Sequence, residues 1–435
     1  MHPKDTSPYH RGGFGLAESV MKSFGAVLAG YGGFGPGFNF LRIALAFSIV
    51  FYHVLTNSGH SPLAHGPVLW FFEYSLVPMF FALSGFLITG SAQRLSLENF
   101  LLNRALRIVP ALAVDILVCA FIIGPAVTTL QLGDYFTDAR FFAYMLNIIG
   151  WAHFELPGVF TGHPVRQVNG ALWTIPWEIN CYIIMSVMMV TGVVRRPVAT
   201  VLLLAIFVIA GLAVEHFTSA EAGDFWGLHT LFVGRGSQLI TAFLCGILAY
   251  QLRDWIPMSR MLFAACVAVA LAAMLLLDMS ATESVANRLM LMPVLTYITI
   301  YAGLSRLRLP KILEGGDYSY GVYLYHVPFI QLAILLGPPI LVSTLVGIVM
   351  LALITGTIVL CVAAVSWHFI EKPILSLRKR YSLAGRMIAR QGRAASRAKT
   401  APALRPNGTE TPFSHAHQFL PIGELPDDRR NSQAQ

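Results

Sequence analysis

The chain has 435 residues, of which 56% are hydrophobic and only 12% are charged, and its mean hydropathy is +0.64. A chain this apolar cannot fold around one water-soluble core, so the composition excludes an ordinary soluble domain and indicates an integral membrane protein. The formal net charge of +8 comes mostly from arginines in loops and in the C-terminal tail. It therefore gives no reason to expect nucleic-acid binding.

Apolar stretches of about twenty residues recur along the chain, separated by short polar or Pro/Gly-containing breaks. This pattern predicts an all-α fold, a polytopic transmembrane bundle of about ten helices, rather than a barrel of alternating strands. The predicted spans are residues 37–57, 70–91, 108–129, 171–193, 198–215, 229–251, 260–277, 288–304, 319–336 and 341–369.

Positive charges fall on one side of this ten-span scheme. Arginines and lysines cluster in the connections after the second, fourth, sixth and eighth spans and in the tail after Lys372, while the opposite connections are richer in Asp and Glu. By the positive-inside rule, both termini are predicted to be cytoplasmic.

The chain divides into three predicted parts: an N-terminal cytoplasmic segment (1–35), a membrane-embedded domain (36–373) and a basic, disordered cytoplasmic tail (374–435) that can lie against anionic membrane lipids. The connection at about 130–170 is much longer than its neighbours, as expected either for a binding element or for a capping loop with aromatic anchors. The five cysteines lie inside predicted spans without CxxC spacing, so we expect neither a disulfide framework nor a metal site.

An arginine and a histidine stand eleven residues apart in the first predicted span, Arg42 and His53. Eleven residues at about 100° each return to within about 20° of the start, so both side chains share one helix face, about 16 Å apart. Ionisable residues within a membrane are costly and are functional candidates by default. Imidazole also suits proton abstraction from a hydroxyl near neutral pH. A core histidine bonded to a neighbouring helix is the alternative.

Arg104 and Arg107 form an Arg-x-x-Arg pair just before the third predicted span. Residues three apart share one face of a helix, and two guanidiniums there can bind phosphate oxygens. With Arg42 at the same predicted depth, the three arginines would form a socket for a polyphosphate. The alternative is that they only mark the cytoplasmic side.

Glu178 follows Trp173 and Trp177 early in the fourth span, where a carboxylate costs about 2.5 to 3.5 kcal/mol unless it finds a partner or water. It can orient or stabilise the histidine, or it is an interfacial carboxylate. In the segment 315–330, Tyr320 and His326 can face a cavity.

Most of the segment 315–330 also suits a simpler role, because tyrosines anchor helices at membrane boundaries and Asp317 with Ser319 is typical of a helix cap. Ser84 and Gly85 in the second span indicate a close helix contact rather than a nucleophile, since no GxSxG turn surrounds them.

Six motifs in order resemble the acyltransferase-3 family of membrane acyltransferases over about residues 36–373. They are Arg42-x10-His53, MFFALSGFLIT, NRALRIVP, LWTIPWEINCY, GDYSYGVYLYHVP and FIEKP. The resemblance implies about ten transmembrane helices in a bacterial inner membrane. It also implies transfer of an acyl group, often acetyl, from cytoplasmic acyl-CoA to a carbohydrate hydroxyl.

Carried over by position, the family's intramembrane histidine falls on His53, its partner arginine on Arg42 and its Arg-x-x-Arg motif on Arg104 and Arg107. The family's acidic residue falls on Glu178, where this sequence has one carboxylate and many relatives have two. We expect a stand-alone O-acetyltransferase without a fused esterase-like domain.

The predicted mechanism places acyl-CoA phosphates, as donor, on the three arginines and uses His53, with Glu178, as the catalytic group. Trp173, Tyr320 and His326 are the candidate substrate-binding residues. Direct transfer and an acyl-histidine intermediate both remain open, as does oxyanion stabilisation by Tyr320 or the backbone. The rival classes are a membrane transporter, against which the chain shows no obvious internal repeat, and a non-catalytic protein on the same fold.

Overall fold

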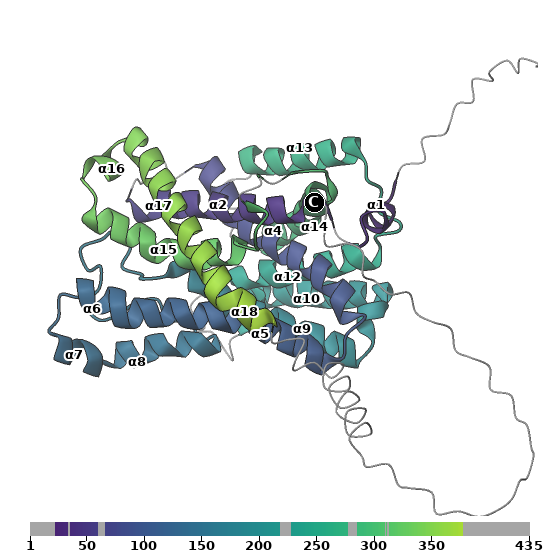
Figure 1. The fold of residues 1–435 in the computed structure, drawn as a ribbon. Helices are drawn as coiled ribbons and strands as arrows, with labels where there is room; N and C mark the ends of the chain where they lie inside the picture. Colours follow the sequence, from purple (N-terminus) through teal and green to yellow (C-terminus); the bar gives the residue numbers. More distant parts are fainter. Residues whose placement is uncertain are drawn as a thin grey trace, which may run out of the picture. The chain divides into compact units, whose positions relative to one another are not determined.

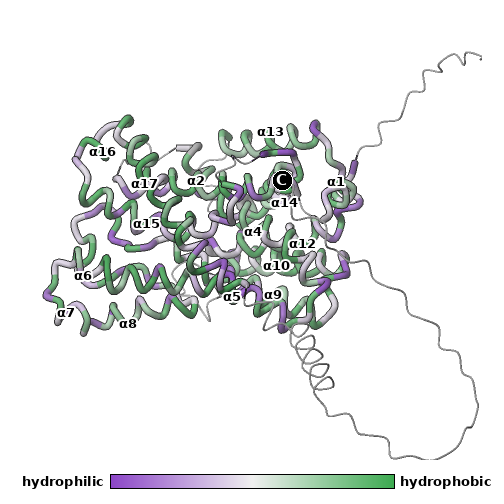
Figure 2. The backbone as a smooth tube through the Cα atoms, in the orientation of Figure 1, coloured by the Kyte–Doolittle hydropathy of each residue, from purple (hydrophilic) through white to green (hydrophobic). Residues whose placement is uncertain are grey.

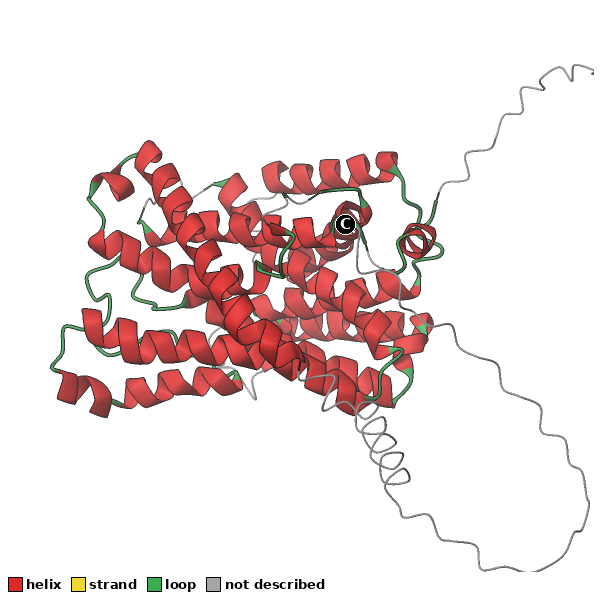
Figure 3. Ribbon diagram, in the orientation of Figure 1, coloured by secondary structure: helices red, strands yellow, loops and turns green. Residues whose placement is uncertain are grey.

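The computed structural model describes residues 22–33, 35–59, 66–217, 228–276, 285–308, 310 and 313–376. Its regular elements are helices, and Figure 3 shows no strand in this part of the chain. Residues 1–21 and 34 of the predicted cytoplasmic segment (1–35) and residues 377–435 of the predicted tail (374–435) lie outside the described residues.

Each predicted span contains a helix (Figure 1). These helices are α2 (Phe38–Asn57), α4 (Pro67–Ala92), α5 (Leu97–Val118), α9 (Ile175–Val190), α10 (Pro197–Phe217), α12 (Arg235–Gln251), α13 (Arg260–Leu276), α14 (Val285–Leu304), α15 (Ser319–Leu336) and α17 (Leu345–Ser366). The all-α membrane bundle is therefore confirmed in class.

Six helical stretches of the described chain are long and apolar enough to cross a membrane by length and composition. They are Phe38–Asn57, Phe71–Ala92, Leu97–Val127, Pro197–Phe217, Ser319–Leu336 and Leu345–Ser376. Figure 2 shows hydrophobic residues, in green, along much of the helical bundle, with hydrophilic residues among them. The protein is thus a multi-pass membrane protein, while ten crossings and cytoplasmic termini stay predictions.

The third predicted span begins earlier than its hydropathy indicated. Helix α5 starts at Leu97, because Ser96 caps it by accepting a hydrogen bond from the Asn99 backbone N–H. Arg104 and Arg107 therefore lie inside a helix and not in a connection before it. A π-helical turn, η1 (Cys119–Ile123), and α6 (Gly124–Val127) continue the same rod.

The long connection also folds into short helices, α7 (Leu132–Thr137), α8 (Ala139–Met145) and η2 (Leu146–Ile149). A 3₁₀ turn, η3 (Gly170–Thr174), then leads into α9. Asn169 caps η3 by accepting a hydrogen bond from the Ala171 backbone N–H. The connection thus ends on a fixed turn that carries Trp173.

Helix α4 packs extensively on α12, and two glycines allow their backbones to approach. A Cβ on Gly85 would overlap the Phe243 carbonyl, and a Cβ on Gly246 would overlap the Ala82 carbonyl. Small residues are favoured where membrane helices cross closely. The close helix contact expected at Ser84 and Gly85 is present at Gly85.

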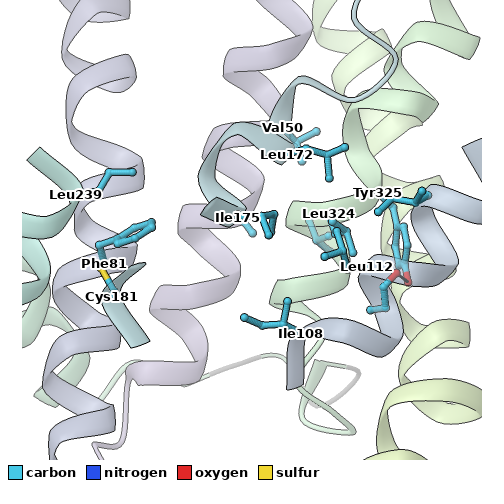
Figure 4. Close-up of a cluster of buried hydrophobic side chains, with 14 of the residues drawn as sticks. Val50, Phe81, Ile108, Leu112, Leu172, Ile175, Cys181, Leu239, Leu324 and Tyr325 are labelled. Atoms are coloured by element: carbon cyan, nitrogen blue, oxygen red, sulfur yellow. Dashed lines mark hydrogen bonds between the residues drawn. The ribbon is translucent and has the colours of Figure 1, made fainter. Parts of the chain in front are cut away.

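The buried interior draws its side chains from α2, α4, α5, α9, α12 and α15. Figure 4 shows representatives of this cluster, among them Val50, Phe81, Leu112, Cys181 and Leu324. Helix α15 packs on α2 and α17 as well as on α5. This packing brings the C-terminal third of the chain against the first predicted span.

Candidate active site

Arg42 of α2 is paired with a carboxylate that lies 275 residues further along the chain. Its Nη1 donates to Asp317 Oδ2 at 3.2 Å, and Arg107 Nη2 donates to the same oxygen at 2.8 Å. Asp317 lies just before α15, where Ser319 Oγ also donates to it. One carboxylate thus fixes two of the three predicted phosphate-binding arginines.

Arg107 has a second carboxylate partner, Glu371, whose Oε2 accepts from Nη1 at 3.4 Å. Glu371 is almost fully buried and ends the π-helical turn η8 (Trp367–Glu371) that follows α17. The Arg107 guanidinium also lies 5.2 Å from the Tyr320 ring centre. A π-helical turn inserts one extra residue and is frequent at functional sites.

Arg104 is different, because it has no ion pair with any described residue. Its buried Nε has no hydrogen-bond partner among them either. Its guanidinium lies 5.9 Å from the ring centre of Phe100, one turn earlier on α5. Of the three arginines, Arg104 has the largest unused capacity to bind an anion.

Ion pairing also sets the titration of Asp317. Burial would raise the pKa of this carboxyl, but Arg107 and Arg42, with the Ser319 hydrogen bonds, outweigh burial and lower the pKa to about 2. A lowered pKa means that the ion pairs stabilise the fold above the ordinary carboxyl pKa and lose this effect as the pH falls towards 2. Asp317 therefore stays ionised throughout the physiological range.

Glu178 lies on the first turn of α9, and its Oε1 accepts from the Tyr182 hydroxyl at 2.5 Å. It lines a cavity of about 140 Å³ with the three arginines and Ser84. We call this the arginine cavity. Its other lining residues are Val77, Phe80, Phe81, Leu83, Ile108, Thr174, Cys181, Tyr182, Ser319, Tyr320 and Tyr323.

His53 contacts a second histidine. Its Nδ1 lies 2.8 Å from Nε2 of His326, which is fully buried on α15. His326 Nδ1 lies 2.6 Å from the Tyr323 carbonyl oxygen, and His53 Nδ1 lies 3.2 Å from the Ile49 carbonyl oxygen. The two rings join α2 to α15.

These contacts determine where the protons sit when both rings are neutral. A carbonyl oxygen only accepts, so His326 must donate from Nδ1 and accept at Nε2. His53 must then donate from Nδ1, which leaves the lone pair on its Nε2. Both ring nitrogens of His326 are occupied by protein contacts, whereas His53 keeps one nitrogen available as a base.

His53 lines a different space, of about 330 Å³, which we call the histidine cavity. Trp173 from η3 and Phe154 from the long connection also line it. The remaining lining residues are Ile49, Tyr52, Phe72, Glu73, Leu76, Val77, Gln167, Gly170 and Arg235. This volume is in the range of small-molecule sites, roughly 300 to 1,000 Å³.

The two cavities share one wall residue, Val77 of α4. Thr174, on the arginine side, is next in sequence to Trp173, on the histidine side. Thr174 Oγ1 lies 2.8 Å from the Tyr323 hydroxyl, and either atom can donate. The two cavities are therefore neighbours, with Val77 in the wall of both.

The predicted residues therefore divide between two spaces. Arg42, Arg104, Arg107, Glu178 and Tyr320 line the arginine cavity, while His53 and Trp173 line the histidine cavity. Glu178 does not line the space of the histidine that it was expected to orient. The Tyr320 hydroxyl donates to the Ile108 carbonyl at 3.2 Å.

The sequence alone assigns no role at the site to Asp317 and Glu371. Both lie in the family-like motifs GDYSYGVYLYHVP and FIEKP, and both are charged residues at predicted membrane boundaries. A charged residue at such a position in so apolar a chain is the signal by which the sequence could identify them as functional candidates. Their pairing with Arg107 joins positions 210 and 264 residues apart, which no local pattern reveals.

Residues 36–367 match the family model described as "Acyltransferase domain". An O-acetyl transferase of Shigella phage Sf6 is 27% identical over 355 residues, which cover 78% of this chain and 96% of that protein. Nodulation protein 10 of Rhizobium leguminosarum bv. viciae is 28% identical over 367 residues, covering 78% of this chain and 93% of that protein. No solved structure matches significantly. Because the family model spans most of the chain, the protein belongs to the acyltransferase-3 family of membrane acyltransferases.

Proposed function

We propose that the protein transfers an acetyl group from acetyl-CoA to a hydroxyl of a carbohydrate or lipid-linked glycan in a bacterial inner membrane. Family membership supports acyl transfer, and the relative from phage Sf6 is named an O-acetyl transferase. The observation that carries the proposal is a pair of adjacent cavities, one lined by three arginines and the other by a histidine with a free ring nitrogen. A transporter would not require this division.

The arginine cavity is the proposed donor site. Guanidiniums bind phosphate oxygens through charge-assisted hydrogen bonds. Arg104 is the main anchor because the carboxylates of Asp317 and Glu371 already engage Arg42 and Arg107. A cavity of about 140 Å³ is too small for a nucleotide, so the adenosine end stays outside and the pantetheine arm reaches inward.

His53 is the proposed general base. The acceptor hydroxyl gives its proton to His53 Nε2 while its oxygen attacks the thioester carbonyl carbon. The carbon–sulfur bond then breaks, and the proton passes from His53 to the departing CoA thiolate. This direct transfer balances without a covalent enzyme intermediate.

We assign the orienting role to His326 rather than to Glu178. The His326 ring accepts from His53 Nδ1, as a third group does in hydrolytic triads, and keeps Nε2 of His53 unprotonated. Glu178 instead lines the arginine cavity, where it accepts a hydrogen bond from the Tyr182 hydroxyl. Trp173 and Tyr320 remain proposed substrate contacts, one in each cavity.

The test is His53→Ala in full-length protein purified in nanodiscs, supplied with radiolabelled acetyl-CoA and glycan-bearing membranes. A positioned base contributes about 10²- to 10⁴-fold, so label transfer is expected to fall by at least about 100-fold. Affinity for acetyl-CoA should remain within about 2-fold, because the arginines lie in the other cavity.

His216→Ala is the matched control, since this exposed histidine on α10 packs only on the neighbouring Phe217 ring among the described aromatic residues. It should transfer label at the parental rate. Full transfer by His53→Ala would remove His53 as the base, and absence of labelled glycan with the parental chain would refute the proposed function.

A further inference from the structure

An ion pair lines the histidine cavity and has no part in the transfer step described above. Glu73 of α4 and Arg235, the first residue of α12, are in salt-bridge contact, and both line the cavity beside His53. The Arg235 guanidinium also lies 5.4 Å from the Tyr74 ring centre. The side chains keep 26% and 46% of their surface exposed, so both remain accessible to a ligand.

The other walls of this cavity combine flat aromatic faces with apolar side chains. Trp173, Tyr52 and Phe154 supply aromatic surface, and Gln167 adds an amide. Gln331 of α15 fixes the segment that carries Gln167 by donating to the Val165 and Gln167 carbonyls at 2.7 and 2.9 Å. His163 Nδ1 is also 2.7 Å from Gln331 Oε1. The cavity wall is therefore built before a ligand arrives.

This set of groups fits the chemistry of a sugar ring. A hydroxyl both donates and accepts, so neighbouring hydroxyls can donate to Glu73 and accept from Arg235 at once. The apolar face of a pyranose can pack on an indole or a phenol ring. His53 lines the same space, which brings a bound hydroxyl within reach of the proposed base.

The ion pair also discriminates between sugars by charge. Glu73 and Arg235 are the carboxylate and guanidinium of the cavity, and together they carry no net charge. An anionic sugar would compete with Glu73 for Arg235 and place two negative charges between apolar walls. Leaving a charge unpaired in such surroundings is unfavourable.

We infer that the histidine cavity binds an uncharged hexose unit of the acceptor, with Glu73 and Arg235 as the residues that recognise its hydroxyls and exclude anionic sugars. This inference rests on the proposed function. It adds the acceptor subsite and its selectivity, which neither the family match nor the relatives' names assign.

The test supplies purified full-length protein in nanodiscs with radiolabelled acetyl-CoA and one of three probes: methyl glucopyranoside, methyl galactopyranoside or methyl glucuronopyranoside. Binding of labelled acetyl-CoA is measured separately and reports the donor site alone. At least one neutral glycoside is expected to gain label at a rate at least 10-fold above the glucuronoside.

Glu73→Gln, Arg235→Gln and the exchanged pair Glu73→Arg with Arg235→Glu test the assigned residues. Each is expected to lower kcat/KM for the neutral glycoside at least 10-fold through KM, with acetyl-CoA affinity within 2-fold of the parental value. The exchanged pair restores an ion pair with the two charges in reversed positions. If the ion pair had only a structural role, this variant would regain both the parental thermal stability and the parental KM. Glu98→Gln, an exposed carboxylate on α5, is the matched control and should change neither.

The outcomes are separable. Equal or faster labelling of the glucuronoside, an unchanged KM in Glu73→Gln and Arg235→Gln, or rescue of KM by the exchanged pair would each overturn the inference. Failure of every glycoside to accept label, with acetyl-CoA still bound and glycan-bearing membranes still labelled, would overturn the subsite and leave the proposed function standing. Loss of acetyl-CoA binding and membrane labelling in the parental chain would instead defeat the proposed function.

Discussion

Arg104 is the arginine whose removal should affect the donor most directly. Charge-assisted hydrogen bonds are worth about 1.5 to 3 kcal/mol, so Arg104→Ala is expected to weaken acetyl-CoA binding by about 10- to 100-fold. Because Arg104 has no ion pair with a described residue, its loss breaks no salt bridge among them. Equilibrium binding of labelled acetyl-CoA measures the effect.

The matched control for this change is Arg94→Ala. Arg94 is exposed just after α4 and is expected to bind acetyl-CoA as the parental chain does. An unchanged affinity of Arg104→Ala for acetyl-CoA would mean that Arg104 does not bind the donor and only contributes to the positive charge of the cytoplasmic side.

His326 gives the second prediction at this scale. If it orients His53, His326→Ala should lower kcat by about 10-fold or more and leave the acceptor KM within about 2-fold, because the substrate loses no contact. A substrate-binding role for His326, which the sequence also allows, predicts the reverse pattern, a raised KM for the acceptor. Steady-state kinetics with the acceptor varied at saturating acetyl-CoA distinguish the two roles.

At the scale of elements, the packing of α4 against α12 fixes the relative positions of residues that line the two cavities. Helix α4 carries Val77 and Glu73, and α12 carries Arg235. Gly85→Ala places a methyl group against the Phe243 carbonyl. Overpacking of this kind typically costs about 1 to 3 kcal/mol. We expect a lowered midpoint of thermal unfolding in detergent, followed by circular dichroism.

Gly133→Ala is the control for that substitution. Gly133 lies on α7, and a Cβ there meets no atom within 4 Å. Alanine is a better helix former than glycine, so this change should leave the midpoint unchanged or raise it slightly. A Gly85→Ala variant as stable as the parental chain would show that the helices can separate without loss.

At the scale of the whole molecule, the orientation predicted from loop arginines has a functional consequence. Cytoplasmic termini would place the connection at 130–170 outside, and with it the wall of the histidine cavity that Phe154 and Gln167 form. The arginine cavity would then open towards the compartment that contains acyl-CoA. Donor and acceptor would approach from opposite sides of the membrane.

Reporter fusions check this orientation. Green fluorescent protein at the C-terminus should fluoresce, and alkaline phosphatase fused within the connection at 130–170 should be active, because each reporter functions on only one side of the membrane. Inactive phosphatase in that connection together with a dark C-terminal fusion would show the opposite orientation. The arginine cavity would then face away from the compartment that contains acyl-CoA.

The sequence by itself determined the fold class and the approximate positions of the helices, because hydropathy is a local property and each span carries its own signal. The start of α5 at Leu97, set by its Ser96 cap, is the exception. It also placed Arg42 and His53 on one helix and Arg104 with Arg107 on another, since helical periodicity acts over a few residues. The motifs identified the acyltransferase-3 family, which the family match confirms.

Only the tertiary structure decided which of these residues face each other. The His53–His326 contact joins positions 273 residues apart, and the Arg42–Asp317 pair joins positions 275 residues apart. Such contacts depend on how α15 packs against α2, which no local pattern encodes. For the same reason, only the structure shows that Glu178 lines the cavity of the three arginines while His53 lines another.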